Sequence, residues 1–389
     1  MNKNTIKPSL GNPARGEAFY PRKREIEKIF KVLDANASIY LSAPRRVGKT
    51  SILQFLEDSQ GDNEYFFIYT ITESVYSVNE FFKVLYDSTI KSKAIKNLAK
   101  ASKAITAFVE GVAAHVDEIP GILKLKEQQE PDYYEKFKEL LDKIEKGVGR
   151  VVIMVDEFPQ TLHNIHKKHG EVEARRLIQM TKEIRVYKLA EDNLSFIYTG
   201  SISLFPMVEK IGQLTDVNDL QPIEVKPLTR VEAEDLLSRL CNRMNIKLKD
   251  DAAKHLLDTI KWFIPFHIQL ICHELEDMYE GKEIEKNGVD IAIDNTIAQK
   301  NKARFEPYFS RLKSLLESNE YRFAMEVLAY TARHDTIDIL YINDCAVKNE
   351  LDNKKEIMDM LCEDGYLFES DGSFIYTSPI LQLWCKKFN

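Results

Sequence analysis

The pattern of apolar and polar positions over residues 1–227 alternates between short strand-like runs and longer helical stretches. Apolar runs rich in β-branched and aromatic residues predict strands at 38–42, 65–71, 151–155, 194–199 and 222–225. Helical spacing between these runs predicts helices at 51–57, 78–112 (with one or two breaks), 133–146 and 171–189. Residues 119–125 are either a small strand or an inserted hairpin. This alternation predicts an α/β fold, in which a parallel sheet lies between two layers of helices.

The pattern becomes helical beyond residue 227. Apolar residues at helical spacing predict helices at 231–240, 251–259 and 266–279. Further helices follow residue 301, and then two strands at 366–370 and 374–378 joined across Asp371-Gly372, a strong hairpin signal. Helices followed by one terminal hairpin are the arrangement of a winged helix. We therefore expect a sheet domain at 1–227, a helical lid at 228–300 and a winged-helix domain at 301–389.

Composition narrows the class of protein. The chain has 389 residues, of which 44% are hydrophobic and 30% charged, as in a folded protein of two or three domains. Its net charge of -7 gives no overall attraction to nucleic acid. Its five cysteines are scattered, which argues against a zinc cluster and fits a reducing compartment. No signal peptide and no apolar run of the ~20 residues needed to cross a bilayer are seen. We expect a cytoplasmic protein without membrane contact.

A phosphate-binding loop follows the first predicted strand. The segment Ala43-Pro44-Arg45-Arg46-Val47-Gly48-Lys49-Thr50 matches the P-loop pattern, with alanine where the first glycine usually stands. Backbone N–H groups at the start of the next helix form an anion cradle, which Gly48 lets a phosphate approach closely. Lys49 neutralises β- and γ-phosphate charge, and Thr50 offers a hydroxyl to Mg²⁺. We expect Lys49 to be exposed and ATP to contact the whole loop, from Ala43 to Ser51.

Two carboxylates follow the most apolar predicted strand. An apolar run at 151–155 is typical of a strand buried on both faces, and it leads directly into Asp156-Glu157. Such a strand delivers Asp156 to the carboxyl edge of the sheet, where it can hold the magnesium shell with Thr50. Glu157 can polarise the attacking water as a general base. Lys49 and Glu157 are therefore the predicted catalytic residues, and Thr50 and Asp156 the predicted metal ligands.

Polar residues also follow the strand predicted at 194–199. If the strand order is that of P-loop ATPases with an additional strand, this strand lies between the other two and its end faces the γ-phosphate. Thr199 or Ser201 could then sense the phosphate by hydrogen bonding. The alternative is a serine that caps a helix at a turn.

Several motifs together resemble one family. Gly11-Asn12-Pro13, then Phe19, Arg22 and Glu25, and the arginine-rich loop resemble the AAA+-like ATPases often called the archaeal ATPase family. Three later segments of the chain also resemble motifs of that family. They are Asp156-Glu157-Phe158-Pro159, Thr199-Gly200-Ser201 and Val225-Lys226-Pro227-Leu228. The family belongs among the STAND signalling NTPases, which continue into a helical lid and a winged helix.

The resemblance implies roles for residues outside the loop. Phe19, Tyr20 and Arg22 would line the adenine pocket, and the lid would contribute near Pro265; the alternative for residues 19–22 is a plain surface turn. The chain departs from the family at Pro21 and Ile264, where glycine is usual. It also lacks an arginine at the start of the lid helix, where His267 is the nearest polar residue. Arg45 and Arg46 either stabilise transition-state charge or pair with acids on a neighbouring domain.

These features favour an ATP-binding, slowly hydrolysing switch that uses Mg²⁺ and whose nucleotide state controls domain arrangement and binding of another protein or a second copy. The alternative is an origin-recognition-like ATPase that binds DNA through the winged helix. Charge disfavours it, because residues 301–389 carry 11 Lys and Arg against 15 Asp and Glu, a net of -4. A third class, a small-molecule kinase, is disfavoured by the lid, the winged helix and the paired Asp156-Glu157.

Overall fold

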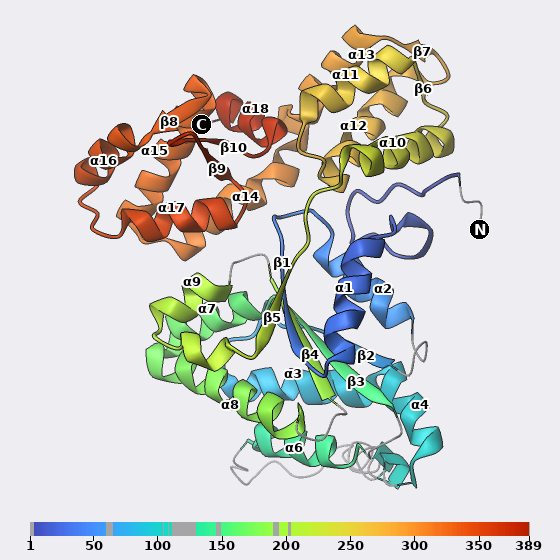
Figure 1. Cartoon of the computed structure of the whole chain (residues 1–389), viewed down its shortest axis with the longest axis vertical. Helices are drawn as coiled ribbons and strands as arrows, with labels where there is room; N and C mark the ends of the chain where they lie inside the picture. Colours follow the sequence, from blue (N-terminus) through green and yellow to red (C-terminus); the bar gives the residue numbers. More distant parts are fainter. Residues whose placement is uncertain are drawn as a thin grey trace, which may run out of the picture. The chain divides into compact units, whose positions relative to one another are not determined.

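A five-stranded parallel sheet forms the centre of the N-terminal half of the chain (Figure 1). The computed structural model describes residues 4–59, 65–103, 105–107, 109–110, 130–144, 149–189, 194–200 and 204–388. The five strands are β1 (Ser38–Ser42), β2 (Tyr65–Ile71), β3 (Arg150–Asp156), β4 (Leu194–Thr199) and β5 (Leu220–Glu224). Their order is β2-β3-β4-β1-β5, so β4 lies between β1 and β3, as expected for a P-loop ATPase with an additional strand.

Helices cover both faces of this sheet (Figure 1). On one face lie α1 (Lys23–Asp34) and α2 (Lys49–Asp58). The other face packs against α3 (Val78–Lys91), α4 (Lys93–Ala101), α6 (Tyr133–Asp142), α7 (Phe158–His169), α8 (Glu171–Leu189) and α9 (Leu204–Lys210). Residues 151–155 of β3 are all fully buried, because successive side chains point to opposite faces and both faces are covered. The predicted α/β fold class is confirmed.

Several element boundaries differ from those that the sequence predicted. A break was expected in the helix predicted at 78–112, and it falls at Ser92, which has an extended backbone and accepts the Ile95 N–H to start α4. Helix α6 ends at Asp142, and β5 begins two residues earlier than predicted. Helices α7 and α9 were not predicted. The strand or hairpin expected at 119–125 lies outside the described residues.

The lid consists of four helices and a short parallel strand pair. They are α10 (Arg230–Met244), β6 (Lys247–Leu248), α11 (Asp250–Ile260), α12 (Pro265–Tyr279), β7 (Glu283–Ile284) and α13 (Lys286–Thr296). Helix α10 begins with a capping box, in which Thr229 and Glu232 satisfy each other's backbone N–H groups. Pro265 occupies the start of α12, where its missing N–H costs nothing. The starts of α10 and α12 are therefore fixed by their local sequence.

The C-terminal domain has the element order of a winged helix (Figure 1). After α14 (Lys302–Leu315) come α15 (Ser318–His334), β8 (Thr336–Asp338), α16 (Ile339–Lys348), α17 (Lys354–Glu363), β9 (Leu367–Ser370), β10 (Ser373–Tyr376) and α18 (Pro379–Phe388). Strands β8, β10 and β9 form an antiparallel sheet. The hairpin turns at Asp371 and Gly372, whose φ angles are 51° and 75°. Positive φ at both central residues is typical of a type I′ turn, as the Asp-Gly pair predicted.

The chain forms two compact units. The sheet unit comprises Arg22–Ser42 and Ile52–Glu224, and the C-terminal unit comprises Met1–Pro21, Ala43–Ser51 and Val225–Asn389. The phosphate loop thus belongs to the same unit as the lid and the C-terminal domain. Among the described residues, no helix combines the length and apolar character needed to span a bilayer. The three-domain division at residues 227 and 300 stays a prediction.

Candidate functional site

The phosphate loop joins the end of β1 to the start of α2. Val47 is 2% exposed and anchors the loop in the core, while Gly48 has a φ of 111°. A side chain at Gly48 would meet nothing within 4 Å, but its backbone would be strained, so glycine is required here for conformation. Helix α2 begins at Lys49, followed by the half-buried Thr50 and the buried Ser51. The first N–H groups of a helix are unsatisfied by the helix itself, which suits them to bind an anion.

Lys49 is buried, with 8% of its surface exposed, so the expectation that it is exposed was wrong. Its ammonium donates hydrogen bonds to the Ala43 carbonyl at 2.5 Å and the Pro44 carbonyl at 3.4 Å. A buried charge is tolerated only where it is hydrogen-bonded, and the loop carbonyls meet that need. The loop thus encloses the cation that it would present to phosphate.

Asp156 ends β3 and is 2% exposed. Its Oδ2 accepts a hydrogen bond of 3.0 Å from the phenol of Tyr69 on the neighbouring β2. Burial, together with the charge of Asp156, raises the pKa of Tyr69 far above its usual value, so the phenol keeps its proton. The sequence predicted the position of Asp156 but not this partner, because Tyr69 reads as one more aromatic residue in a strand.

Glu157 lies at the junction between β3 and α7, in a left-handed conformation with a φ of 62°. Such a backbone is rare for a residue with a side chain, costs about 1–3 kcal/mol and is concentrated at functional sites. Helix α7 begins at the next residue, with Pro159 in its first turn. The chain therefore turns sharply at Glu157, between the strand that ends at Asp156 and helix α7.

The end of β4 contributes Thr199 and Gly200. Thr199 is fully buried, and its hydroxyl donates to the Leu41 carbonyl of β1 at 2.9 Å. A Cβ atom on Gly200 would lie 2.6 Å from Cδ of Pro159 and 3.5 Å from Oε2 of Glu157. Gly200 thus allows the end of β4 to approach the turn that holds Glu157, a constraint that the motif alone does not show. Ser201 lies outside the described residues.

Strand topology explains how these residues gather. Strands β1, β3 and β4 are parallel neighbours, so their carboxyl ends meet at one edge of the sheet. Ser42, Asp156 and Thr199 are the last residues of these three strands. The phosphate loop follows Ser42 directly along the chain. The sheet thereby places the carboxylate pair and Thr199 at the edge from which the loop departs.

Arg46 links the phosphate loop to the lid within the C-terminal unit. Its guanidinium carbon lies 4.5 Å from the centroid of the Phe266 ring, in the first turn of α12. Arg46 has a φ of 64°, a second left-handed backbone at this site. The sequence left two roles open for the loop arginines, and the described contacts include no acidic partner for Arg46. The contact that Arg46 makes is with an aromatic ring.

His267 is fully buried next to Phe266, and neither ring nitrogen has a hydrogen-bond partner among the described residues. Burial, reinforced by the charge of Arg46, lowers the pKa of His267 to about 3. The residue is therefore neutral at pH 7. It cannot supply the positive charge that a nucleotide-sensing arginine supplies at the start of a lid helix.

The predicted adenine-pocket residues fall into both units. Phe19 is half-buried, and the hydroxyl of Tyr20 donates to Asp235 of α10 at 2.9 Å. Both belong with the phosphate loop and Pro265 to the C-terminal unit. Arg22 belongs to the sheet unit, where it is 4% exposed and forms a 3.1 Å ion pair with Glu25. The N-terminal segment is thus attached to the lid through Tyr20.

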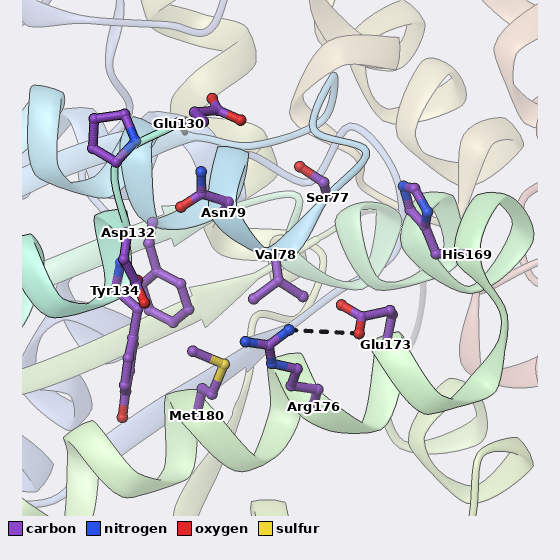
Figure 2. Close-up of a pocket in the computed structure, with 12 residues that line it drawn as sticks. Ser77, Val78, Asn79, Glu130, Asp132, Tyr134, His169, Glu173, Arg176 and Met180 are labelled. Carbon is purple, nitrogen blue, oxygen red and sulfur yellow. Dashed lines mark hydrogen bonds and ion pairs between the residues drawn. The ribbon is translucent and has the colours of Figure 1, made fainter. Parts of the chain in front are cut away.

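A separate cavity of about 340 Å³ lies in the sheet unit (Figure 2). Val78, Phe82 and Met180 contribute apolar surface, and Arg176 forms a 3.6 Å ion pair with Glu173 at its edge. None of the residues predicted for nucleotide binding lines this cavity. The sequence contained no signal for it, because its walls come from α3, the start of α6 with the segment before it, the end of α7, and α8, which are separated along the chain.

Comparisons with known proteins identify the class of this fold. Residues 19–260 match the family described as "ATPase domain predominantly from Archaea". The chain belongs to this ATPase family. The match covers the sheet domain, including the phosphate loop and the Asp156-Glu157 pair, and the first two lid helices. The protein is accordingly a P-loop ATPase of this family, as the motifs indicated.

A solved structure shares the fold over nearly the whole chain. A Walker-type ATPase of Pyrococcus abyssi, PABY2304, superposes with a TM-score of 0.67 at 17% identity, covering 97% of this chain and 99% of that one. Cdc6p from Pyrobaculum aerophilum has a TM-score of 0.43 at 12% identity, covering 96% of each chain. No curated protein matches the sequence. The first likeness shows that the ATPase fold continues through the lid and the C-terminal domain.

Proposed function

We propose that this ATPase is a molecular switch, in which ATP bound with Mg²⁺ sets the arrangement of the lid and the C-terminal domain, and slow hydrolysis resets it. The observation that carries the proposal is that the phosphate loop itself contacts both of these parts. Arg46 lies over Phe266 of the lid. A Cβ atom on Gly365 of the C-terminal domain would lie only 2.9 Å from Cβ of Pro44. A nucleotide bound to this loop therefore lies next to residues that contact both the lid and the C-terminal domain.

The physical argument concerns differential binding. A ligand shifts a conformational equilibrium only if it interacts differently with the two states. Phosphate recruits the Lys49 ammonium, which donates here to the carbonyls of Ala43 and Pro44. Removing these hydrogen bonds frees the Pro44 segment, which packs against Gly365. Phosphate contacts in a loop of this kind bias two-state arrangements in other nucleotide switches.

The residues at the sheet edge fit a magnesium site. Within the described ranges, no three His, Cys, Asp or Glu side chains are placed to hold a metal by themselves. Magnesium at a P-loop needs fewer protein ligands, because phosphates and waters fill the remaining positions. Asp156 and Thr50 would hold the ion, which when bound neutralises charge on the β- and γ-phosphates. Glu157 would take the proton of the attacking water.

The surface of the C-terminal domain favours a protein partner, either another protein or a second copy, over DNA. Exposed side chains on α17 are Lys355, Glu356, Asp359 and Glu363, three acids against one base. A helix that binds a DNA groove is normally basic, because phosphate neutralisation supplies much of the affinity. On α16, Leu340 is 69% exposed and Val347 is 78% exposed. Apolar exposure of this kind is more often covered by protein than by nucleic acid.

The test of the switch uses the Glu157→Gln variant, which should hold ATP without turnover. Hydrogen exchange would be compared with and without Mg-ATP over residues 263–268 and 363–367. We expect the protection of both segments to change on binding. The Lys49→Ala variant is the control, because it should not bind nucleotide and should show no change. Unchanged protection in a protein shown to be saturated with ATP contradicts the switch and leaves an ATPase without this coupling.

A further inference from the structure

Two peptide groups flank the left-handed backbone of Glu157. The first begins with the carbonyl of Asp156, which accepts the N–H of Thr72 at 3.0 Å and its hydroxyl at 3.1 Å. The second begins with the Glu157 carbonyl, which accepts the N–H of Thr161 at 3.1 Å and lies 3.3 Å from the Thr161 hydroxyl oxygen. A peptide group is planar, so the orientations of these two planes determine φ and ψ of Glu157. Thr72 and Thr161 therefore hold the backbone conformation of this residue.

The two threonines also contact each other. The hydroxyl of Thr161 donates to the Thr72 carbonyl at 2.7 Å, and its oxygen lies 2.8 Å from the Thr72 hydroxyl oxygen. Both residues are fully buried. Asn164, one turn further along α7, donates to the carbonyls of Glu73 at 2.8 Å and Val75 at 3.2 Å. Helix α7 is thereby bonded to the segment after β2, which in turn holds the end of β3.

We propose that Thr72 and Thr161 are positioning residues for the hydrolytic step: they hold the left-handed turn that sets the direction of the Glu157 side chain. The inference rests on the proposed function, since it takes Glu157 as the general base. A residue with a side chain keeps a left-handed backbone only where the surrounding structure enforces it. A general base must lie within hydrogen-bond reach of the proton that it takes, so a small rotation of this turn lowers the rate.

Substitution by valine tests the two hydroxyl groups, because valine keeps the branched shape of threonine and removes the donor. Thr161→Val removes the hydroxyl contacts with Thr72, and Thr72→Val removes one of its two hydrogen bonds to the Asp156 carbonyl. The matched control is Thr70, two residues earlier, on β2. Thr70 is 2% exposed, and its hydroxyl has no hydrogen-bond partner among the described residues. Thr70→Val therefore makes the same change at a neighbouring buried position without breaking a hydrogen bond.

The experiment measures the chemical step by single-turnover phosphate release, with circular dichroism to verify folding. We expect Thr161→Val and Thr72→Val to lower the rate constant about 10-fold or more, since a displacement of about 1 Å can cost about 100-fold. The Kd for a non-hydrolysable Mg-ATP analogue should stay within about threefold of the wild type, because the change acts on the chemical step. Thr161→Ser keeps the hydroxyl and should restore most of the rate, and Thr70→Val should react at the wild-type rate.

A double-mutant cycle shows whether Thr161 acts through Glu157. Groups that act as a unit have non-additive effects, so Thr161→Val should slow the Glu157→Gln protein by less than about twofold. A full further loss in that background contradicts the inference. A rate in Thr161→Ser as low as in Thr161→Val contradicts it too, as does a loss of equal size in Thr70→Val. Thr72→Val provides the test if Thr161→Val does not fold.

Failure of this inference can be distinguished from failure of the proposed function. If Glu157→Gln hydrolyses ATP at the wild-type rate, Glu157 is not the base, and the proposed function is wrong on this point. If Glu157→Gln is inactive while the folded valine variants at positions 72 and 161 react at the wild-type rate, the base assignment stands and the positioning inference is overturned.

Discussion

The guanidinium carbon of Arg46 lies 4.5 Å from the centroid of the Phe266 ring. Arg46 belongs to the phosphate loop, and Phe266 belongs to the first turn of the lid helix α12. The arginine side chain is largely exposed while the ring is 7% exposed. A cation above an aromatic face at a partly exposed site contributes about 0.5–1 kcal/mol. The free energy of this contact is small enough for a bound nucleotide to break the contact.

We therefore expect Arg46→Ala to weaken the coupling between nucleotide and lid. Loss of about 0.5–1 kcal/mol should change the ATP-dependent protection of residues 263–268 about two- to fivefold in hydrogen exchange. Arg230 lies 6.0 Å from the Phe263 ring in the same lid, so Arg230→Ala is the control that removes an arginine from an aromatic face away from the loop. Equal responses in the two variants would show that the Arg46 contact has no special part in the coupling.

Lys49→Ala should abolish measurable ATP binding while the fold persists. Hydrogen bonds to charged groups contribute about 1.5–3 kcal/mol each, and the lysine of a P-loop contacts both the β- and the γ-phosphate, so affinity should fall about 100-fold or more. Because Lys49 also donates to Ala43 and Pro44, the loop itself should become more mobile in hydrogen exchange. Equilibrium binding of a fluorescent ATP analogue measures the effect, with circular dichroism to verify folding. Lys31→Ala, on the exposed face of α1, is the control. Unchanged affinity in Lys49→Ala would contradict the assignment of this loop as the phosphate-binding site.

Glu157→Gln should separate binding from hydrolysis. Glutamine keeps the shape of the side chain and tolerates the same left-handed backbone, but it does not accept a proton. Turnover should fall about 10²- to 10⁴-fold, the usual contribution of a general base, while the Kd for Mg-ATP stays within about threefold of the wild type. Single-turnover phosphate release measures the chemical step. A variant that hydrolyses ATP at the wild-type rate shows that another group is the base.

Gly200→Ala should disturb both stability and turnover. The added methyl group would lie 2.6 Å from Cδ of Pro159, which is backbone-linked and cannot rotate away, so α7 or the end of β4 must shift. Overpacking of this kind costs about 1–3 kcal/mol. The shift also displaces Glu157, whose Oε2 would lie 3.5 Å from the new atom, so turnover should fall. Denaturant unfolding and steady-state ATPase activity test this.

Gly11→Ala is the matched control, because a Cβ atom there meets nothing within 4 Å. Its free energy of unfolding and its turnover should stay near the wild-type values. If Gly200→Ala is as stable and as active as Gly11→Ala, the close approach of β4 to α7 does not constrain the site.

Duplex DNA should not bind the full chain at physiological salt. Residues 301–389 carry a net charge of -4, and the exposed face of α17 is acidic, so DNA phosphates would be repelled. Basic residues at Lys302, Arg304 and Lys313 of α14 are too few to offset this. Fluorescence anisotropy with random and AT-rich duplexes, with and without ATP, measures binding. Submicromolar affinity that falls steeply with salt would favour the origin-recognition-like alternative.

Local sequence was enough to predict the elements and motifs that depend on residues next to one another along the chain. The phosphate loop needs a strand, a glycine and a helix start in succession, and the Asp371-Gly372 hairpin needs only two residues with positive φ. The apolar run of β3 predicted burial on both faces, and the order of strands and helices predicted the fold class. Each of these depends on neighbours along the chain, which a sequence displays directly.

The tertiary structure decided how these motifs are supported. Lys49 is buried because the loop folds back around it, and the Thr199 hydroxyl is bonded to Leu41, 158 positions away in the chain. The contacts of Tyr69 with Asp156 and of Gly200 with Pro159 depend on strand register and on the approach of a helix to a strand end. Residue type and spacing do not predict such contacts, because each contact results from packing between segments that are distant in the sequence.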